Sequence, residues 1–392
     1  MPVVDLFCGC GGLSCGFQLA GFDVVAAYDF WEPAVKLYNK NIEGEHASIL
    51  DLSDAQAAIQ AINPYAPTII IGGPPCQEFS DAGSRIEGEK ANLTYIYSEI
   101  ITGVLPQYFV MENVPRTRSS KAYAKAKQKY IDAGYGLTEV VLDAGRCGVP
   151  QKRSRFFCIG SLNATHGFLL GNIFAHYTGA EKSVKDYFSE QGYPLDINAY
   201  YRHPTTYERK AIFSVETPSP TIRGVNRPKP ATYTRHSRDD VTNEGLPAIR
   251  HLTKRERARI QTFPDNFIFE ESGISNGGIE QMIGNAVPVQ LAAFIAQRLN
   301  EYMEGNHLDN ESAFVRWLKT SKNYTDRTIG DVFSRINRAK EILPDRPLSR
   351  YFITDLEITP QFSELSTDIK SQIRRAIRLR LAFEDETRGA AK

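Results

Sequence analysis

An α/β fold with a parallel sheet, covered by helices on both faces, is predicted by three features of this 392-residue sequence. Short apolar runs alternate with helix-length segments in residues 1–160, as in proteins built from strand–helix–strand units. These runs lead into glycine, proline or acidic residues, and parallel sheets bind ligands at the loops beyond their strands. Hydrophobic residues make up 42% of the chain, which is enough for at least one large core.

Five buried strands are predicted in this first part of the chain. They are Val3–Phe7, Val24–Tyr28, Thr68–Ile71, Tyr108–Met111 and Phe156–Gly160. Helices are predicted between them, for example at Pro33–Asn41 and Tyr95–Leu105. Because ligands sit beyond the carboxyl ends of parallel strands, the loops that follow these strands are the expected site.

The rest of the chain shows different patterns. From Thr165 to about Ala248 the periodicity fades and Pro, Tyr, Thr and basic residues accumulate, which predicts an irregular insert. Helical patterns return at Lys254–Phe263 and Ile279–Leu299, and a separate helical tail begins near Gly305. In the tail an apolar residue recurs every four positions, at Ile369, Ile373, Ile377 and Leu381. The expected segments are therefore 1–164, 165–275, 276–304 and 305–392.

Composition narrows the class of protein. Lys plus Arg and Asp plus Glu both number 46, so the neutral chain is not a globally basic nucleic-acid coat protein. No run approaches the roughly 18 apolar residues of a membrane span, and Asp5 with Gly9–Gly16 interrupts any secretory signal. Six cysteines without a CxxC pair or neighbouring histidine predict reduced thiols in a cytoplasmic protein and no metal site.

The first chemical motif is a glycine-rich turn after the first strand, from Asp5 to Ser14. Glycines let backbone groups approach a ligand closely, but Ser14 replaces the third glycine of the G-x-G-x-x-G pattern of dinucleotide sites. Asp29, at the end of the second strand, suits a ribose diol. The combination favours a nucleoside cofactor without a pyrophosphate, such as S-adenosylmethionine. A structural turn with a capping aspartate is the alternative.

Two further strand ends carry groups suited to catalysis. The glycine–proline run at 72–75 fixes a loop that presents Cys76, a candidate nucleophile if its thiolate is favoured. Glu112 ends the fourth strand and can act as an acid or hydrogen-bond donor if its pKa is raised. The alternatives are a buried small side chain at Cys76 and a solvated or capping carboxylate at Glu112.

Three more blocks complete the pattern: Gln151-Lys152-Arg153-Ser154-Arg155, Arg250 to Pro264, and Gln281 to Val289. In order and spacing, the whole set resembles the DNA (cytosine-5) methyltransferases over about residues 1–300, apart from the insert. The Pro-Pro-Cys-Gln and Gln-x-Arg-x-Arg blocks are the most specific. The resemblance implies a Rossmann-like S-adenosylmethionine-dependent methyltransferase sheet. A smaller, irregular target-recognition domain at 165–275 would interrupt it, and a helical extension would follow.

The resemblance also implies covalent catalysis on a cytosine taken out of the DNA stack. Cys76 would attack C6 of the flipped base, and Glu112 would protonate or hydrogen-bond N3 so that charge drains from the ring. C5 would then take the methyl group from S-adenosylmethionine. Arg155 matches the arginine that contacts the flipped cytosine, and Arg153 matches one that supports the active-site loop.

Ten residues match cofactor-contacting positions of that family. They are Phe7, Cys10, Gly12, Asp29, Phe30, Asp51, Leu52, Pro75, Asn285 and Val287. By this resemblance Phe7 faces the adenine, Phe30 stacks on it and Asp29 takes the ribose hydroxyls. The chain departs from the family at two of these positions, because the family more often has Glu in place of Asp29 and Trp, Ile or another apolar residue in place of Phe30.

The insert has the strongest local charge. Between Arg202 and Arg238, eight Lys and Arg residues stand against two Glu, a local balance of +6. Basic side chains suit phosphates and arginine suits guanine edges. The residues expected to contact DNA are Arg202, Arg209, Arg223, Arg227, Lys229 and Arg235. A solvated loop is the alternative. A second basic run, from Arg116 to Lys129, could line the DNA cleft or form a solvated helix face.

The sequence therefore predicts a sequence-specific DNA cytosine-5 methyltransferase with double-stranded DNA as partner and S-adenosylmethionine as cofactor. The expected setting is the cytoplasm of a prokaryote. There the enzyme would protect DNA from a restriction endonuclease that acts on the same site without a stable complex. The alternatives are a tRNA cytosine-5 methyltransferase of the same architecture, a catalytically inactive DNA-binding homologue and a nicotinamide dehydrogenase. The failed dinucleotide spacing and the Pro-Pro-Cys loop argue against the last.

Overall fold

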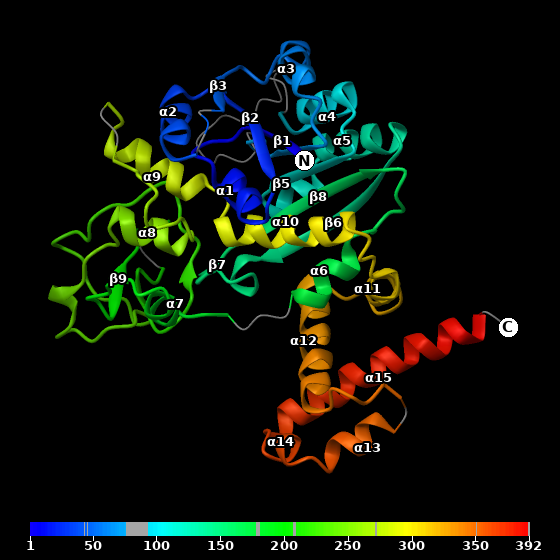
Figure 1. Ribbon diagram of the computed structural model, residues 1–392. Helices are drawn as coiled ribbons and strands as arrows, with labels where there is room; N and C mark the ends of the chain where they lie inside the picture. Colours follow the sequence, from blue (N-terminus) through cyan, green and yellow to red (C-terminus); the bar gives the residue numbers. More distant parts are fainter. Residues whose placement is uncertain are drawn as a thin grey trace. The chain divides into compact units, whose positions relative to one another are not determined.

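The structure is a computed structural model that describes residues 1–42, 44, 46–75, 93–177, 181–206, 209–270, 273–349 and 351–390 (Figure 1). It divides into two units. One comprises Met1–Thr165 and Ala180–Gln297, and the other comprises His166–Gly179 and Arg298–Lys392. His166–Gly179 thus groups with the C-terminal helices, although its sequence predicted a place at the start of the small domain.

Seven strands of the described chain form the central sheet of the larger unit. They are β1 (Pro2–Leu6), β2 (Asp23–Asp29), β3 (Ala47–Ile49), β4 (Ile69–Gly72), β5 (Tyr108–Asn113), β6 (Tyr135–Asp143) and β8 (Ser154–Leu162). Their order is β3-β2-β1-β4-β5-β8-β6. The strands from β3 to β5 in that order are parallel, whereas β8 runs antiparallel to β5 and β6. The predicted α/β class is confirmed, but the fifth predicted strand breaks the expected parallel order.

Branched apolar side chains explain why the interior strands form. Val3 and Val4 in β1 and the isoleucines 69–71 in β4 have no exposed surface, as is typical of interior strands in a parallel sheet. The sequence did not predict β3 and β6. β3 has three residues, two of them exposed, and Thr138 and Glu139 interrupt the apolar run of β6. Pairing with β2 and β8 stabilises these two strands despite their weak patterns.

Helices cover both faces of this sheet (Figure 1). They are α1 (Gly12–Leu19), α2 (Glu32–Asn41), α3 (Ala55–Ile62), α4 (Leu93–Val104), α5 (Lys121–Asp132) and α10 (Val289–Met303). Apolar residues of α3, α4 and α5 share one core with β1, β4 and β5. In that core the rings of Phe109 and Tyr130 lie 4.4 Å apart. On the other face α1 and α10 approach closely, because a Cβ on Gly16 would lie 2.4 Å from the Cβ of Ala292.

The predicted helical stretch Ile279–Leu299 is interrupted. It forms α9 (Asn276–Asn285) and α10, which are separated by a break that contains Pro288. The break leaves Val287 in non-helical backbone and Asn285 at the end of α9. Among the described residues, the stretch Asn276–Met303 is long and apolar enough to cross a membrane. However, 78% of its most apolar window is buried inside the protein, as in a core helix.

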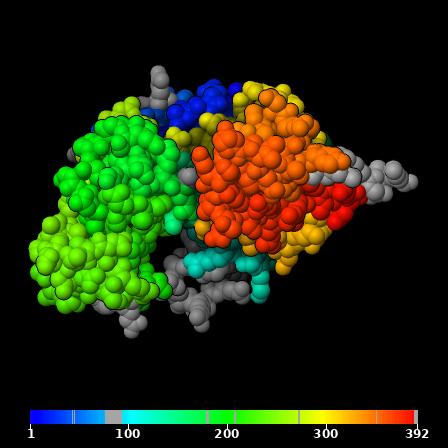
Figure 2. Space-filling view, turned by 90° about the horizontal axis from the view of Figure 1, so that it is seen from below, coloured from blue at the N-terminus to red at the C-terminus, as the bar shows by residue number. Residues whose placement is uncertain are grey.

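The insert is irregular, as predicted, and its described residues form only short elements. They are α7 (Val184–Glu190), β9 (Ala199–Tyr201), β10 (Ile212–Ser214), β11 (Ser219–Pro220) and α8 (Lys254–Ile260). The short strand β7 (Gln151–Lys152) precedes the insert. Short 3-10 turns lie at Asn63–Tyr65, Pro115–Ser119, Ala144–Arg146 and Leu246–Ala248. Thr253 and Glu256 form a capping box that starts α8. In the space-filling view the insert makes a continuous green surface (Figure 2).

The second unit is helical. Its helices are α6 (Leu170–His176), α11 (Asp309–Ser321), α12 (Asp326–Ile342), α13 (Phe352–Glu357), α14 (Pro360–Ser363) and α15 (Thr367–Ala390). The predicted apolar stripe of α15 faces its core, where Ile373 and Ile377 pack with Phe352 and Phe362. Arg380 of α15 is buried and forms an ion pair with Glu384. Part of the basic content of this helix is therefore structural.

Candidate active site

Most of the predicted site residues follow the carboxyl ends of the parallel strands. β1 leads into the glycine-rich turn, β2 ends at Asp29, β4 leads into Gly73, and β5 carries Glu112 near its end. β1 and β4 are neighbours, and the strand order runs in opposite directions from this pair. Open α/β sheets bind ligands at such a switch point. The topology therefore brings the predicted cofactor and catalytic segments to one edge of the sheet.

The glycine-rich turn adopts left-handed backbone. Gly9 and Gly11 have φ of 52° and 94°, and Phe7 has φ of 58°, which is costly for a residue with a side chain. The carboxylate of Asp29 accepts hydrogen bonds from the backbone N–H groups of Gly9 and Trp31, each at 2.9 Å. Burial raises the pKa of Asp29, and these N–H groups oppose the shift. Asp29 therefore holds the turn in place, in addition to its predicted role toward a ribose.

A buried hydrogen-bond chain supports the same turn. The hydroxyl of Tyr38 donates to Ser14 at 2.9 Å, and the hydroxyl of Ser14 donates to Asp5 at 2.6 Å. Burial raises the pKa of Asp5 to about 7; the hydrogen bond from Ser14 opposes this shift and the charge of Asp29 adds to it. The ring of Tyr38 also packs under Gly11, because a Cβ on that glycine would lie 3.1 Å from it.

The predicted cofactor residues differ in exposure. The ring of Phe30 is 68% exposed, which leaves it free to stack on a planar ligand. The side chains of Asp51, Pro75 and Asn285 are also exposed, whereas Cys10 and Val287 are buried. A Cβ on Gly12 would lie 2.5 Å from the carbonyl oxygen of Val287, so the turn contacts the α9–α10 break. Leu52 packs in the core, which gives its side chain a structural role.

Asn113 ties the end of β5 to the loop that follows β4. Its amide donates to the carbonyl of Pro74 at 2.8 Å, and its oxygen accepts from the hydroxyl of Thr117 at 3.0 Å. A Cβ on Gly73 would lie 3.2 Å from Oε2 of Glu112, so glycine leaves room for that carboxyl group. Cys76, the predicted nucleophile, lies outside the described residues.

Glu112 and Arg155 form the predicted catalytic pair. Nε of Arg155 lies 2.8 Å from Oε1 of Glu112, and their side chains are only 14% and 10% exposed. Burial raises the pKa of Glu112, while Arg155 and then Arg153 oppose the shift. Raising this pKa favours a protonated carboxyl group that can donate a hydrogen bond to a ligand.

Arg153 is fully buried and serves the backbone. It donates to the carbonyl oxygens of Ile222, Gly284 and Ala286 at 2.8, 2.9 and 3.1 Å. Burial lowers the pKa of Arg153, and the neighbouring Arg155 adds to this effect. Arg153 thus joins the backbone at Ile222 to the α9–α10 break, and its hydrogen bonds do not go to the described residues of the loop at 72–75.

The structure separates the basic residues of the insert into two groups. Arg202, Arg223 and Arg235 donate to the carbonyl oxygens of Thr221, His203 and Val241, so these side chains hold the insert together. Arg209 makes a long bond to the hydroxyl of Thr205 at 3.3 Å. Arg227 and Lys229 form no hydrogen bond or ion pair with any described residue. Prolines 228 and 230 flank Lys229 and stiffen this stretch.

Two other features lie apart from the strand ends. In the second basic run, Arg116, Arg118, Lys121 and Lys125 are exposed, whereas Lys127 pairs with Glu139.

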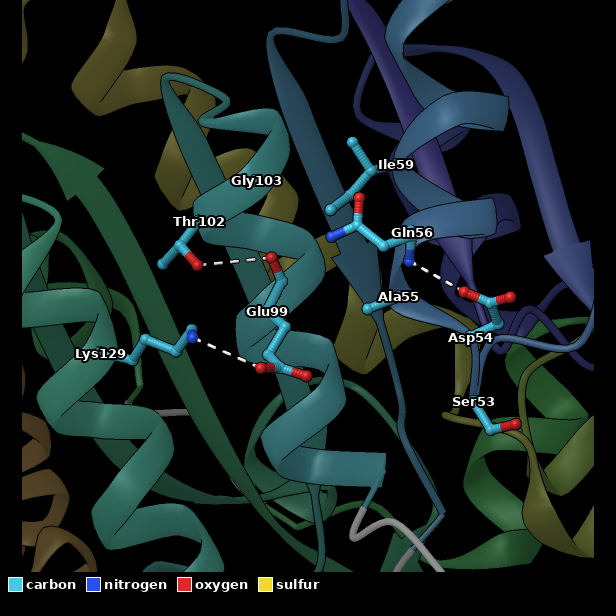
Figure 3. Close-up of a pocket in the computed structure, with 9 residues that line it drawn as sticks. All are labelled: Ser53, Asp54, Ala55, Gln56, Ile59, Glu99, Thr102, Gly103 and Lys129. Atoms are coloured by element: carbon cyan, nitrogen blue, oxygen red, sulfur yellow. Dashed lines mark hydrogen bonds and ion pairs between the residues drawn. The ribbon is translucent and has the colours of Figure 1, made fainter.

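A cavity of about 590 Å³ lies between α3, α4 and α5 (Figure 3). It is lined by Ser53, Asp54, Ala55, Gln56, Ile59, Glu99, Thr102, Gly103 and Lys129. None of these belongs to the predicted site.

Several buried polar residues near the site had no predicted role. Tyr38 and Ser14 support the glycine-rich turn, Gln261 binds backbone carbonyls of the α9–α10 break, and Asp239 organises the insert. Tyr38 could have been predicted from the sequence, because a polar hydroxyl at a core-facing position of an amphipathic helix needs a buried partner. Asp239 lies in irregular chain, where no such pattern exists.

The family profile and the individual relatives that match this chain agree on the kind of protein it resembles. The profile of the family "C-5 cytosine-specific DNA methylase" matches residues 1–301. The type II methyltransferase M.HindV of Haemophilus influenzae is 47% identical over 300 residues, which is 76% of this chain and 96% of that protein. The type II methyltransferase M.HgiDI of Herpetosiphon aurantiacus is 48% identical over 306 residues, which is 77% of this chain and 95% of that protein.

Solved structures share the fold at lower identity. The Dnmt2 methyltransferase of S. pombe matches with a TM-score of 0.59 at 21% identity, over 77% of this chain and 99% of that one. A putative DNA modification methyltransferase encoded within an E. coli prophage matches with a TM-score of 0.52 at 20% identity, over 78% and 99%. Residues 302–392 lie beyond the family match.

Proposed function

The chain belongs to the C-5 cytosine-specific DNA methylase family, and on that premise we propose that it modifies DNA within a type II restriction–modification system. It transfers a methyl group to C5 of one cytosine in a short target sequence. The relatives that carry the name type II methyltransferase support this role, because the match covers almost their whole length. A restriction endonuclease would cut the same sequence when it is unmodified, without a stable complex with this chain.

The buried Glu112–Arg155 pair is the observation that carries the proposed chemistry. A neutral carboxyl group of Glu112 donates a hydrogen bond to N3 of the flipped cytosine, and this draws electron density away from the ring. Burial favours that neutral form. Arg155 orients the carboxyl group through Nε and keeps guanidinium N–H groups for the base. Asn113 keeps the loop at residues 73–75 beside this pair.

Cys76 supplies the nucleophile in the proposed reaction. Its thiolate forms a bond to C6, and the C5–C6 double bond becomes a carbanion-like centre at C5. After C5 has gained the methyl group, a base such as water removes the C5 proton. The C6–S bond then breaks and the double bond returns, so the thiolate is regenerated.

The residues at the β1 and β2 ends fit S-adenosylmethionine. Exposed Phe30 offers a face for adenine, while the glycine-rich turn offers backbone groups to the amino-acid part. Asp29 has lone pairs beyond those used by Gly9 and Trp31, which suit the ribose hydroxyls. When bound, the cofactor supplies a methyl group activated by a sulfonium. Asp51, Pro75, Asn285 and Val287 complete the proposed pocket.

Double-stranded DNA is the proposed partner of the insert. Arg227 and Lys229 are the side chains best placed for it, because no described residue binds them. Arg202, Arg223 and Arg235 shape the surface and keep their remaining N–H groups for phosphates. The proposed setting is the cytoplasm of a prokaryote, where the chromosome is accessible.

Bisulfite sequencing of plasmid DNA from cells that express the protein tests this function, with a Cys76→Ala variant as control. Protected cytosines in one short motif, absent from the control, are the expected result. Unprotected DNA from folded protein that binds S-adenosylmethionine would instead favour the tRNA or inactive-homologue alternatives. Protection that persists in the variant would overturn Cys76 as nucleophile.

A further inference from the structure

The backbone of Ile222 is held by two side chains, Gln151 of β7 and Arg153, which lies between β7 and β8. Its N–H donates to Oε1 of Gln151 at 2.8 Å, and its carbonyl oxygen accepts from Arg153 at 2.8 Å. Ile222 is not part of a regular strand, so these side chains satisfy groups that a sheet would otherwise pair. The chain continues from Ile222 into the stretch with Arg227 and Lys229. Gln151 and Arg153 therefore fix the start of the basic segment 221–229, which is the part of the insert proposed to contact DNA.

A second amide extends this contact across the unit. Nε2 of Gln151 donates to Oε1 of Gln261 at 2.7 Å. Nε2 of Gln261 donates in turn to the carbonyl oxygens of Ile283 and Ala286, at 2.6 and 3.1 Å. Both glutamines have no exposed surface. Because Gln151 must accept from an N–H and Gln261 must donate to carbonyls, only one orientation of both amides satisfies every group.

Arg155, one member of the Glu112–Arg155 pair, follows on the same stretch of chain at the start of β8, while Glu112 lies on the neighbouring β5. Residues 151, 153 and 155 alternate along extended chain and therefore project to the same side. Gln151 and Arg153 hold the recognition segment, whereas Arg155 holds Glu112 at 2.8 Å. The two side chains that hold Ile222 therefore lie four and two positions before Arg155 in the sequence.

We propose that Gln151 and Gln261 are positioning residues, through which the placement of the segment 221–229 on DNA sets the geometry of the Arg155–Glu112 pair. This inference rests on the proposed function. It predicts that these buried amides act on the rate of methyl transfer and on its sequence preference, more than on DNA affinity. Misplacing a reacting group by about 1 Å can cost about 10²-fold in rate.

Single-turnover methyl transfer by the full-length protein tests the proposal. The substrates are two oligonucleotide duplexes, one with the motif found by bisulfite sequencing and one with a single base pair of that motif changed. Gln151→Met keeps the side-chain length but removes both hydrogen bonds. Gln151→Glu keeps the acceptor for Ile222 and loses the donor to Gln261 when ionised. Gln372→Glu, on an exposed position of α15, is the matched amide-to-acid control.

We expect Gln151→Met to lower the single-turnover rate on the target duplex by about 10²-fold, with the reaction amplitude and the DNA dissociation constant nearly unchanged. The rate on the altered duplex falls less, so the ratio of the two rates contracts. Gln151→Glu gives a smaller loss of the same kind, and Gln372→Glu gives none.

Three outcomes would overturn the proposal. The first is a Gln151→Met protein whose melting temperature and reaction amplitude fall while its single-turnover rate constant keeps the wild-type value. Gln151 would then contribute only to folding stability. The second is an equal loss on both duplexes, which removes the link to recognition. The third is a loss confined to DNA affinity. If the wild-type protein itself transfers no methyl group to either duplex, the proposed function fails rather than this inference.

Discussion

Asp239 is the polar centre of the insert, and replacing it with asparagine is predicted to loosen this domain selectively. Oδ1 accepts from the backbone N–H groups of Ala211 and Ile212 at 2.9 and 3.0 Å. Oδ2 accepts from the hydroxyl of Tyr233 at 2.6 Å and from the N–H of His236 at 2.8 Å. The side chain thus binds four donors while its residue is only 5% exposed.

The cost of Asp239→Asn follows from these four bonds. The amide NH₂ is best placed toward Tyr233, whose hydroxyl can rotate and accept, so that only the N–H of His236 loses its acceptor. An unsatisfied buried donor costs about 1–3 kcal/mol, and the remaining bonds lose their charge assistance. We therefore expect a loss of about 2–4 kcal/mol in the free energy of unfolding of the insert.

Urea denaturation, together with separate titrations of DNA and S-adenosylmethionine, measures this effect. DNA affinity should fall while cofactor affinity stays, because all four donors to Asp239 belong to the insert, whereas the proposed cofactor pocket lies at the ends of β1 and β2. Asp196→Asn is the matched control, since Asp196 is 81% exposed and pairs only at the surface with Arg250. Its expected cost is below about 1 kcal/mol. An unchanged unfolding curve for Asp239→Asn, or equal losses of both affinities, would refute the reasoning.

The same carboxylate predicts acid lability. Burial opposes ionisation of Asp239, but the hydrogen bond from Tyr233 and those from backbone N–H groups prevail and lower its pKa below the ordinary value. A lowered folded-state pKa contributes stability that is present above the pKa of the unfolded chain, and is lost as pH falls through the folded-state value. Asp239→Asn should therefore show a flatter loss of stability on the acid side.

Three further predictions concern the larger unit. Phe30→Ala removes one stacking partner worth about 0.5–1.5 kcal/mol and should raise the dissociation constant of S-adenosylmethionine about 2- to 12-fold. An unchanged constant in isothermal titration would exclude the stacking role. Burial raises the pKa of Asp5 from 3.8 to about 7. The unfolded chain releases this proton at lower pH than the folded chain, so stability falls as pH rises from about 4 to 7 and levels off above that. Asp5→Asn should therefore flatten the fall in melting temperature between about pH 4 and pH 7, and an unaltered slope would contradict this. Gly284→Ala would bring a Cβ within 2.2 Å of the Arg223 backbone. Differential scanning calorimetry should show a loss of about 1–3 kcal/mol in the free energy of unfolding. Wild-type stability would mean that the backbone around Arg223 can move aside.

The fold class followed from the sequence alone, and so did most residues of the candidate site. Alternating apolar runs located four of the parallel strands, because strands buried on both faces need continuous apolar residues. Motifs with a fixed order placed Glu112, Arg153 and Arg155 beside the strand ends, and the family match covers these residues. The local charge of the insert also marked its basic segment without any structure.

Which polar groups bind the backbone, and which remain for a ligand, depends on the three-dimensional fold. Asp29 could be identified as a carboxylate at a strand end, but its bonds to Gly9 and Trp31 depend on how a turn folds back over β2. In the same way, six basic residues of the insert looked equivalent, whereas three of them donate to backbone carbonyl oxygens elsewhere in the insert. The partners in these bonds lie between 2 and 20 positions apart and depend on how turns and loops fold, so no periodic pattern of residues encodes them.

The direction of β8 and the pairing of Gln151 with Gln261 were decided in the same way. Antiparallel pairing of β8 with β5 and β6 depends on the path of the chain, since a strand of either direction has the same alternation of side chains. The two glutamines lie 110 positions apart in the sequence. Their contact arises because a buried amide must find partners for all its polar groups, and only the packed fold determines where those partners lie.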